Sequence, residues 1–156
     1  MNIMRRRMLL ALACAAVDLR VARAQPSAPG FDPTQYLGRV LYLDFWASWC
    51  APCQESFPFM VRLVRSIPST DFSVVAVNVD HDRSKADAFL NRFGDSAPLP
   101  VVFDPSGALA SRYAVKAMPT SLVIGRDGRT RYVHSGFFPE QEGLYTRHIQ
   151  EIIHES

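Results

Sequence analysis

The segment Trp-Cys-Ala-Pro-Cys, residues 49–53, limits the possible folds of this chain more than any other feature. An apolar run over residues 40–45 predicts a buried strand before it, and apolar residues at helical spacing over 57–67 predict a helix after it. Cys50 is therefore expected at a helix N-terminus, where unpaired backbone N–H groups and the helix dipole favour a thiolate. Cys53 follows one turn later, within reach of the first sulfur. The pattern indicates a redox-active cysteine pair at a strand-to-helix junction.

The longer segment Phe-Trp-Ala-Ser-Trp-Cys-Ala-Pro-Cys, residues 45–53, resembles the active-site segment of the thioredoxin superfamily. It is most similar to that of the exported TlpA/ResA-type thiol-disulfide oxidoreductases. The resemblance implies a thioredoxin-like α/β fold, in which helices flank a central mixed β-sheet. A helix and a strand expected between residues 80 and 104 match the insertion that this branch carries. The expected order from about Leu37 to Ser156 is β-α-β-α-β-α-β-β-α.

Asp44 is the one charged residue in its otherwise apolar predicted strand. A carboxyl group there must be neutral or have a partner, and the resemblance implies that it moves protons to and from Cys53. The alternative is a carboxylate at the end of the strand, in contact with a loop or with water. Many TlpA/ResA-type proteins have a glutamate three residues after the second cysteine, where this chain has Ser56. Glu55 is expected to be a solvated helix residue.

A second element that the resemblance singles out is Met118-Pro119-Thr120. In the superfamily a cis-proline at this place faces the cysteine pair, and the residue before it offers backbone groups to a substrate strand. The alternative is a trans proline that opens a strand. By resemblance the catalytic residues are Cys50, Cys53 and Asp44, with a redox-active Cys50–Cys53 disulfide. The expected substrate-binding residues are Trp49, Ala51, Pro52, Met118, Pro119 and Thr120.

Two other interpretations of the cysteine pair are a zinc half-site and a structural disulfide. A zinc site needs further ligands, and no cysteine follows Cys53. A structural disulfide stabilises most by closing a long loop, whereas this loop is minimal. Residues 80–82, Asp-His-Asp, are expected to form a turn and cap the next helix rather than bind a metal. His134, His148 and His154 share no spacing and are expected at the surface; we predict no metal and no cofactor.

The first 24 residues differ in composition from the rest, with five arginines against one aspartate. A basic start, an apolar stretch over residues 8–17 and an Ala-Arg-Ala cleavage site at 22–24 predict a signal peptide over 1–24. The apolar stretch is shorter than the about 20 residues of a membrane span. Cys14 leaves a lipoprotein as an alternative. Residues 25–36, rich in Pro, Ser and Gly, are expected to be a linker, and residues 37–156 the thioredoxin-like domain.

The resemblance implies a periplasmic oxidoreductase that reduces protein disulfides through a mixed disulfide, in cytochrome c maturation or copper-site assembly. The implied partners are protein thiol or disulfide clients and a membrane-embedded electron donor, and we expect a monomer. The remainder after the leader is nearly neutral, so nucleic acid is not an expected partner. A disulfide-forming oxidant is an alternative, although such proteins usually carry a His where Ala51-Pro52 stands. A non-enzymatic, thiol-based copper-binding module is another. A peroxidase is disfavoured because Leu43 occupies the position of its proline.

Overall fold

The computed structural model describes residues 30–96 and 99–155, so the signal peptide expected over 1–24 lies outside the described residues. Five strands in the described part form one mixed sheet in the order β3-β2-β1-β4-β5. The strands are β1 (Val40–Trp46), β2 (Phe72–Asn78), β3 (Val101–Phe103), β4 (Thr120–Ile124) and β5 (Thr130–Ser135). The helices are α1 (Ala51–Ser66), α2 (Arg83–Leu90), α3 (Ala108–Arg112) and α4 (Glu142–His154), with 3-10 turns η1 (Pro33–Tyr36), η2 (Asn91–Ser96) and η3 (Pro139–Gln141).

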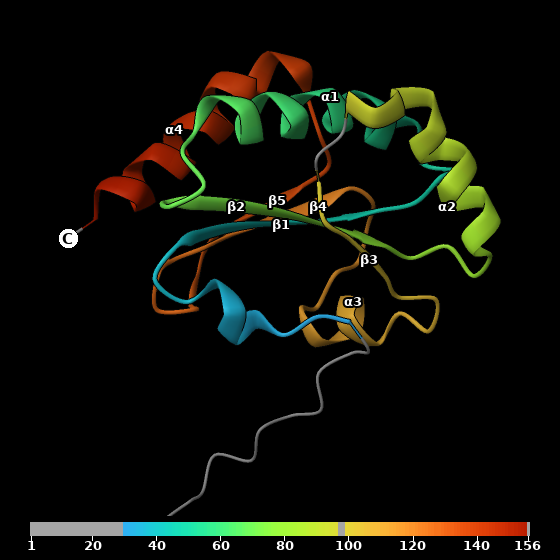
Figure 1. Ribbon diagram of the computed structural model, residues 1–156, viewed down its shortest axis with the longest axis horizontal. Helices are drawn as coiled ribbons and strands as arrows, with labels where there is room; N and C mark the ends of the chain where they lie inside the picture. The colour runs from blue at the N-terminus through green and yellow to red at the C-terminus, as the bar shows by residue number, and fades with distance from the viewer. Residues whose placement is uncertain (1–29, 97–98, 156) are drawn as a thin grey trace, which may run out of the picture.

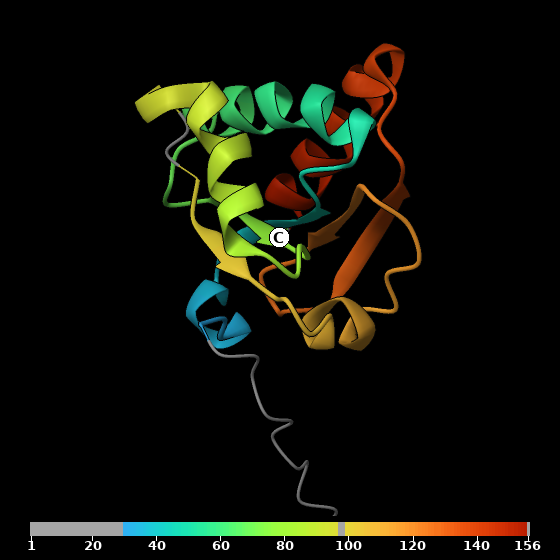
Figure 2. The same cartoon turned by 90° about the vertical axis from the view of Figure 1, so that its right-hand side faces the viewer.

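The arrangement is the thioredoxin-like α/β fold that the sequence predicts, with the same order of strands and helices. β1 pairs in parallel with β2 and antiparallel with β4, which makes the sheet mixed. Helices α1, α2 and α4 cover one face, and η1 and α3 lie against the other (Figure 1). The segment between β5 and α4 passes alongside α1 (Figure 2), where the Phe59 and Phe137 ring centroids are 5.6 Å apart.

β1 lies at the centre of the sheet, and all seven of its residues are buried. Its side chains alternate between two hydrophobic clusters, as successive residues of a strand must. Tyr42 and Trp46 belong to the cluster beneath α1 and α4, whereas Leu43 and Phe45 belong to the cluster beneath α3. Burial on both faces explains why the strand is apolar almost throughout. Asp44, by the same alternation, lies on the α1 side.

Some element boundaries differ from the sequence-based expectation. Phe31 is 2% exposed and stacks on Tyr36 of η1, so packing begins inside the stretch expected to be a linker. The helix expected over residues 85–93 begins earlier, at Arg83, because Asp82 caps it by accepting a hydrogen bond from the Ser84 backbone N–H. These differences leave the predicted topology unchanged.

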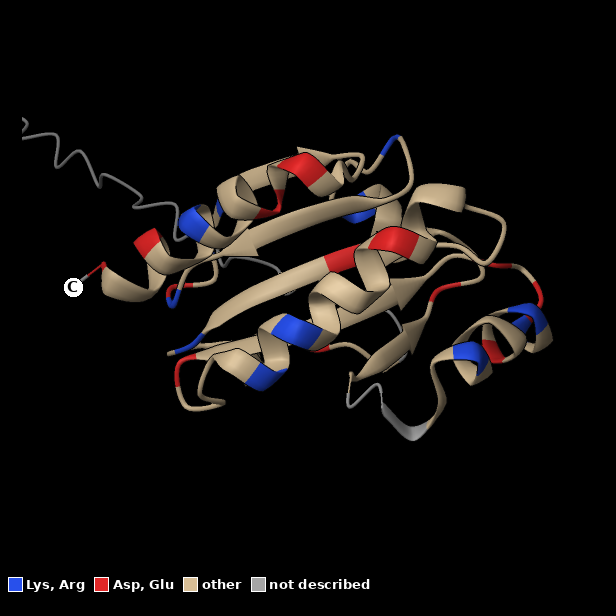
Figure 3. Cartoon of the chain, turned by 90° about the horizontal axis from the view of Figure 1, so that it is seen from above, with Lys and Arg blue, Asp and Glu red and all other residues tan. Residues whose placement is uncertain are grey.

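Basic and acidic residues are interspersed along the helices (Figure 3). An ion pair joins Arg62 of α1 to Glu142 of α4 at 2.7 Å. Of the helices in residues 30–96 and 99–155, none combines the length and hydropathy of a membrane span.

Candidate functional site

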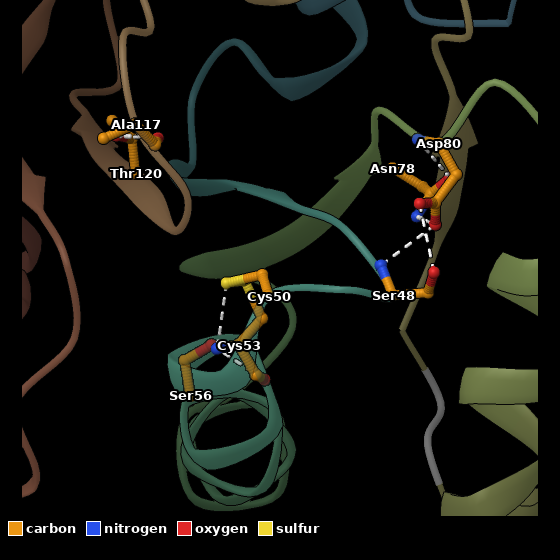
Figure 4. The surroundings of a disulfide bond; sticks show 8 residues. All are labelled: Ser48, Cys50, Cys53, Ser56, Asn78, Asp80, Ala117 and Thr120. Carbon is orange, nitrogen blue, oxygen red and sulfur yellow. Dashed lines mark hydrogen bonds between the residues drawn. A yellow bond between two sulfur atoms is a disulfide. The ribbon is translucent and has the colours of Figure 1, made fainter.

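Cys50 and Cys53 form a disulfide at the N-terminus of α1, with their Cα atoms 5.3 Å apart (Figure 4). Cys50 is the N-cap residue, and its sulfur accepts a hydrogen bond from the Cys53 backbone N–H at 3.2 Å. Helix-terminal N–H groups have no intrahelical partner, and together with the helix dipole they stabilise negative charge. In the reduced protein the same N–H group therefore favours the thiolate of Cys50. Pro52 stands in the first turn, where its missing N–H removes no helical hydrogen bond.

The two sulfurs differ in accessibility. Cys50 retains 4% exposure, whereas Cys53 is completely buried. Trp49, the residue before Cys50, is 71% exposed, and Ala51 and Pro52 are exposed as well. The surface around the pair is therefore open on the Cys50 side, next to the Trp49 ring.

The loop that leads into Cys50 is fixed by a buried carboxylate that sequence reasoning did not assign to the site. Asp80 accepts hydrogen bonds from the Ser48 backbone N–H at 3.0 Å and the Ser48 hydroxyl at 3.1 Å. The Asn78 side-chain amide donates a third at 2.8 Å (Figure 4). The position of Asp80 could have been predicted from the topology, because β1 and β2 run parallel and their carboxyl ends meet at one edge of the sheet. Polar residues directly after β2 are thus placed beside the loop after β1.

Asp44 is fully buried on the face of β1 that α1 covers. Burial raises the pKa of its carboxyl group to about 8, because desolvation disfavours the charged form. The Ser121 hydroxyl on the neighbouring strand β4 opposes this rise. Among the described residues, neither carboxyl oxygen has a partner in hydrogen-bond geometry. Asp44 is therefore a mostly neutral acid at pH 7 that can take up or release a proton near that pH.

The Met118–Pro119 peptide bond is cis. Pro119 and Thr120 are buried and Met118 is partly buried. The Thr120 hydroxyl donates to the Ala117 carbonyl at 2.8 Å, on the opposite side of the disulfide from Ser48 in the view of Figure 4. The Pro119 carbonyl accepts from the Gly136 backbone N–H at 2.8 Å. These contacts fix the loop, and the Thr120 hydroxyl forms its hydrogen bond within the loop.

The position that holds glutamate in many TlpA/ResA-type proteins is structural in this chain. Ser56 is 2% exposed, and its hydroxyl donates to the Cys53 carbonyl at 3.2 Å. Glu55 is exposed, as expected. Neither side chain therefore offers a buried carboxyl group, whereas Asp44 is fully buried.

The expectation that the histidines are unrelated surface residues is wrong for two of them. His134 of β5 and His148 of α4 share a hydrogen bond of 2.9 Å between Nε2 and Nδ1. The His148 ring also stacks on Tyr132, with centroids 3.9 Å apart. Spacing along the chain could not show this contact, because it joins a strand to a helix across the fold.

A model of the Redoxin family matches residues 25–147. The thiol-disulfide oxidoreductase ResA of Geobacillus thermodenitrificans is 28% identical over 119 residues, which are 76% of this chain and 66% of that protein. ResA of Bacillus subtilis is 31% identical over 103 residues, which are 66% of this chain and 56% of that protein. The chain thus spans less than two thirds of the length of these curated relatives.

Solved structures show the same likeness. A candidate thiol:disulfide interchange protein DsbE from Chlorobium tepidum is 40% identical, with a TM-score of 0.73, over 77% of this chain and 84% of that one. The exposed lipoprotein thioredoxin Etrx1 of Streptococcus pneumoniae is 31% identical, with a TM-score of 0.63, over 78% and 90%. With its fold, its cysteine pair and these relatives, the chain belongs to the Redoxin family and is a thioredoxin-superfamily protein of the ResA/TlpA type.

Proposed function

We propose that this chain is a thiol-disulfide oxidoreductase that reduces protein disulfides through Cys50 and Cys53. The observation that carries the proposal is the Cys50–Cys53 disulfide at the N-terminus of α1, on the sheet face that also buries Asp44. The names of the ResA relatives support the same chemistry.

In the proposed reaction the thiolate of Cys50 attacks one sulfur of a client disulfide. A Cys50–client mixed disulfide forms, and the other client sulfur leaves as a thiolate. Cys53 then loses its proton and attacks the Cys50 sulfur. This step forms the Cys50–Cys53 disulfide and releases the second client thiolate. The client gains two electrons and the cysteine pair loses two. The order follows the accessibility of the sulfurs, since Cys53 is completely buried.

Asp44 is proposed to accept the proton that Cys53 loses. Its pKa of about 8 is much nearer than that of an ordinary carboxyl group to the about 8.5 of a free thiol, so moving a thiol proton to Asp44 needs less free energy. A carboxyl group with an ordinary pKa would be a much weaker base for this step. In the reverse reaction, neutral Asp44 returns the proton to Cys53.

We further propose that the protein acts in the periplasm as a monomer, on clients of cytochrome c maturation or copper-site assembly. The basic and apolar composition of residues 1–24 supports export. Because an oxidising compartment does not maintain dithiols, a membrane-embedded electron donor is proposed to return the pair to its reduced form.

Disulfide reduction by the purified chain tests the proposal. With dithiothreitol as electron source, the wild-type protein should accelerate insulin reduction. Cys50→Ser should abolish turnover, because the attacking sulfur is lost. Cys53→Ser should accumulate mixed disulfides that non-reducing gels and mass spectrometry detect. Cys14→Ser, which alters the third cysteine of the chain, is the matched control and should retain activity. Normal turnover by Cys53→Ser would contradict the two-cysteine scheme.

The reduction potential of the Cys50–Cys53 pair decides the direction. A value near or below about −250 mV, close to that of thioredoxin, supports a reductant. A value near about −120 mV, like that of DsbA, assigns the chain as an oxidant instead. Stoichiometric copper uptake without insulin reduction would favour a copper-binding module.

A further inference from the structure

Two buried polar residues, Tyr42 and Ser121, lie beside Asp44, and the proposed reaction gives neither of them a role. In the antiparallel pairing of β1 with β4, Ser121 stands directly opposite Asp44. The Tyr42 hydroxyl, two residues before Asp44 on the same face of β1, donates to the Ser121 Oγ at 2.7 Å. All three residues are buried in a sheet face that is mostly apolar. Three polar side chains thus meet beneath the helix that carries Cys53.

The direction of the Tyr42–Ser121 hydrogen bond has a consequence for the Ser121 proton. A serine hydroxyl has one donor and two acceptor positions. Because the Oγ atom accepts from Tyr42, the Ser121 proton is free to point elsewhere. Its two cross-strand neighbours are Asp44 of β1 and His134 of β5, and each has a side-chain acceptor without a partner among the described residues. An ionised carboxylate is a stronger hydrogen-bond acceptor than a neutral imidazole, so Asp44 is the acceptor once it loses its proton. On the other side of Asp44 stands Ala76 of β2, which has no polar side chain.

We propose that Ser121, oriented by Tyr42, donates a hydrogen bond to the ionised carboxylate of Asp44 and is a positioning residue for proton transfer at Cys53. The inference rests on the proposed function, because it assigns a partner to the proton acceptor of that reaction. When Asp44 is neutral, the carboxyl group does not need this donor. When Asp44 loses its proton, Ser121 stabilises the charge that forms in the apolar core.

Ser121 is the side chain that opposes the rise in the Asp44 pKa caused by burial. The titratable groups on this face are Tyr42 of β1, Cys53 of α1, Tyr132 and His134 of β5, and Tyr145 and His148 of α4. Among the described residues, burial and the Ser121 hydroxyl are the two causes that act on the Asp44 pKa. Burial likewise raises the pKa of Tyr42 well above its usual range, so its hydroxyl remains a donor throughout.

The test follows the Asp44 carboxyl carbon by NMR in the full-length oxidised protein labelled with carbon-13 aspartate. Asp44→Asn identifies the resonance. Ser121→Ala should raise the midpoint of the Asp44 titration by about one pH unit, since a hydrogen bond to the charged form is lost. Ser121→Thr keeps a hydroxyl group and should restore the wild-type midpoint. Ser56→Ala, an equally buried serine on α1, is the matched control and should leave the midpoint unchanged.

Tyr42→Phe keeps the ring and tests the orienting hydrogen bond separately. It should raise the Asp44 midpoint in the same direction as Ser121→Ala but by less, because Ser121 keeps its proton and loses only its orientation. This variant also serves if Ser121→Ala does not fold. An unchanged midpoint in Ser121→Ala, or in Tyr42→Phe where that is the variant available, overturns the inference. An equal shift in Ser56→Ala overturns it as well.

A second readout separates this inference from the proposed function. The rate at which Cys53 releases a client thiol from the Cys50 mixed disulfide is measured against pH. In Ser121→Ala the midpoint of this profile should rise by about one unit, so that the rate at lower pH falls about tenfold. If the NMR midpoint moves and the rate profile does not, the hydrogen bond is supported and the proton role of Asp44 is overturned.

Discussion

At the scale of single residues, the buried carboxyl group of Asp44 makes the free energy of unfolding depend on pH. Its pKa rises from about 3.8 in the unfolded chain to about 8 in the folded protein, so the folded state holds the proton more tightly. Its effect on stability is therefore favourable at low pH and is lost as pH rises from about 4 to about 8. We predict that Asp44→Asn, which cannot ionise, exceeds the wild-type free energy of unfolding by a few kcal/mol at pH 8. The two proteins should converge near pH 4.

Urea unfolding of the oxidised proteins at pH 4, 6 and 8 measures this difference. Asp87→Asn, at an exposed position on α2, is the control and should follow the wild-type profile. Parallel profiles for wild type and Asp44→Asn would contradict the assignment. The gain in stability should accompany a loss of disulfide reduction, because the residue that destabilises the core is the proposed proton acceptor.

At the scale of elements, the hydrogen bonds of Asp80 hold the loop before α1 to the end of β2. We predict that Asp80→Ala lowers the free energy of unfolding by roughly 2–4 kcal/mol, because three hydrogen bonds to a buried carboxylate are lost. It should also slow disulfide reduction, since Ser48 no longer fixes the approach to Cys50. Asp82→Ala removes an exposed helix cap and should lower the free energy of unfolding by less than Asp80→Ala does. Chemical denaturation and insulin reduction compare the two variants.

Equal losses in both aspartate variants would show that the buried network does not hold the loop. Retention of full activity in a destabilised Asp80→Ala protein would separate folding from positioning. In that case the effect of Asp80 would lie in stability alone.

Local patterns could predict most elements, but not the contacts between them. The apolar run of β1, the helical spacing after Cys53 and the Asp82 cap each depend on neighbours in the chain, and each was predictable. Phe31 was assigned to a linker because its burial depends on Tyr36 and the far face of the sheet. The Asp80–Ser48 bonds and the His134–His148 bond join residues that only tertiary packing brings together. The cysteine pair was predictable because both cysteines lie within one short segment, residues 49–53.

At the scale of the whole molecule, the His134–His148 contact joins the edge strand β5 to the last helix, α4. Burial lowers the pKa of His134 to about 4, and His148 adds to this effect. Tyr132 and Tyr145 also contact the His134 ring, and the Tyr132 hydroxyl donates to Glu151 of α4. Since the unfolded pKa is about 6.5, the folded protein loses stability as pH falls from about 6.5 to about 4.

We predict that acid weakens the packing of α4 on β5 by roughly 1–2 kcal/mol, a value reduced for the partial exposure of His134. His134→Phe cannot be protonated, so it should lose less stability between pH 6.5 and 4 than the wild type. His154→Phe, at an exposed position near the C-terminus, is the matched control and should behave as wild type. Urea unfolding with tyrosine fluorescence measures the difference, and equal acid sensitivity in all three proteins would contradict it. As pH falls over the same range, protonation of Asp44 raises the free energy of unfolding, which opposes the effect of His134. In His134→Phe the opposing contribution is gone, so the increase that Asp44 causes should be larger. Its stability should then rise steadily as pH falls from 8 to 4.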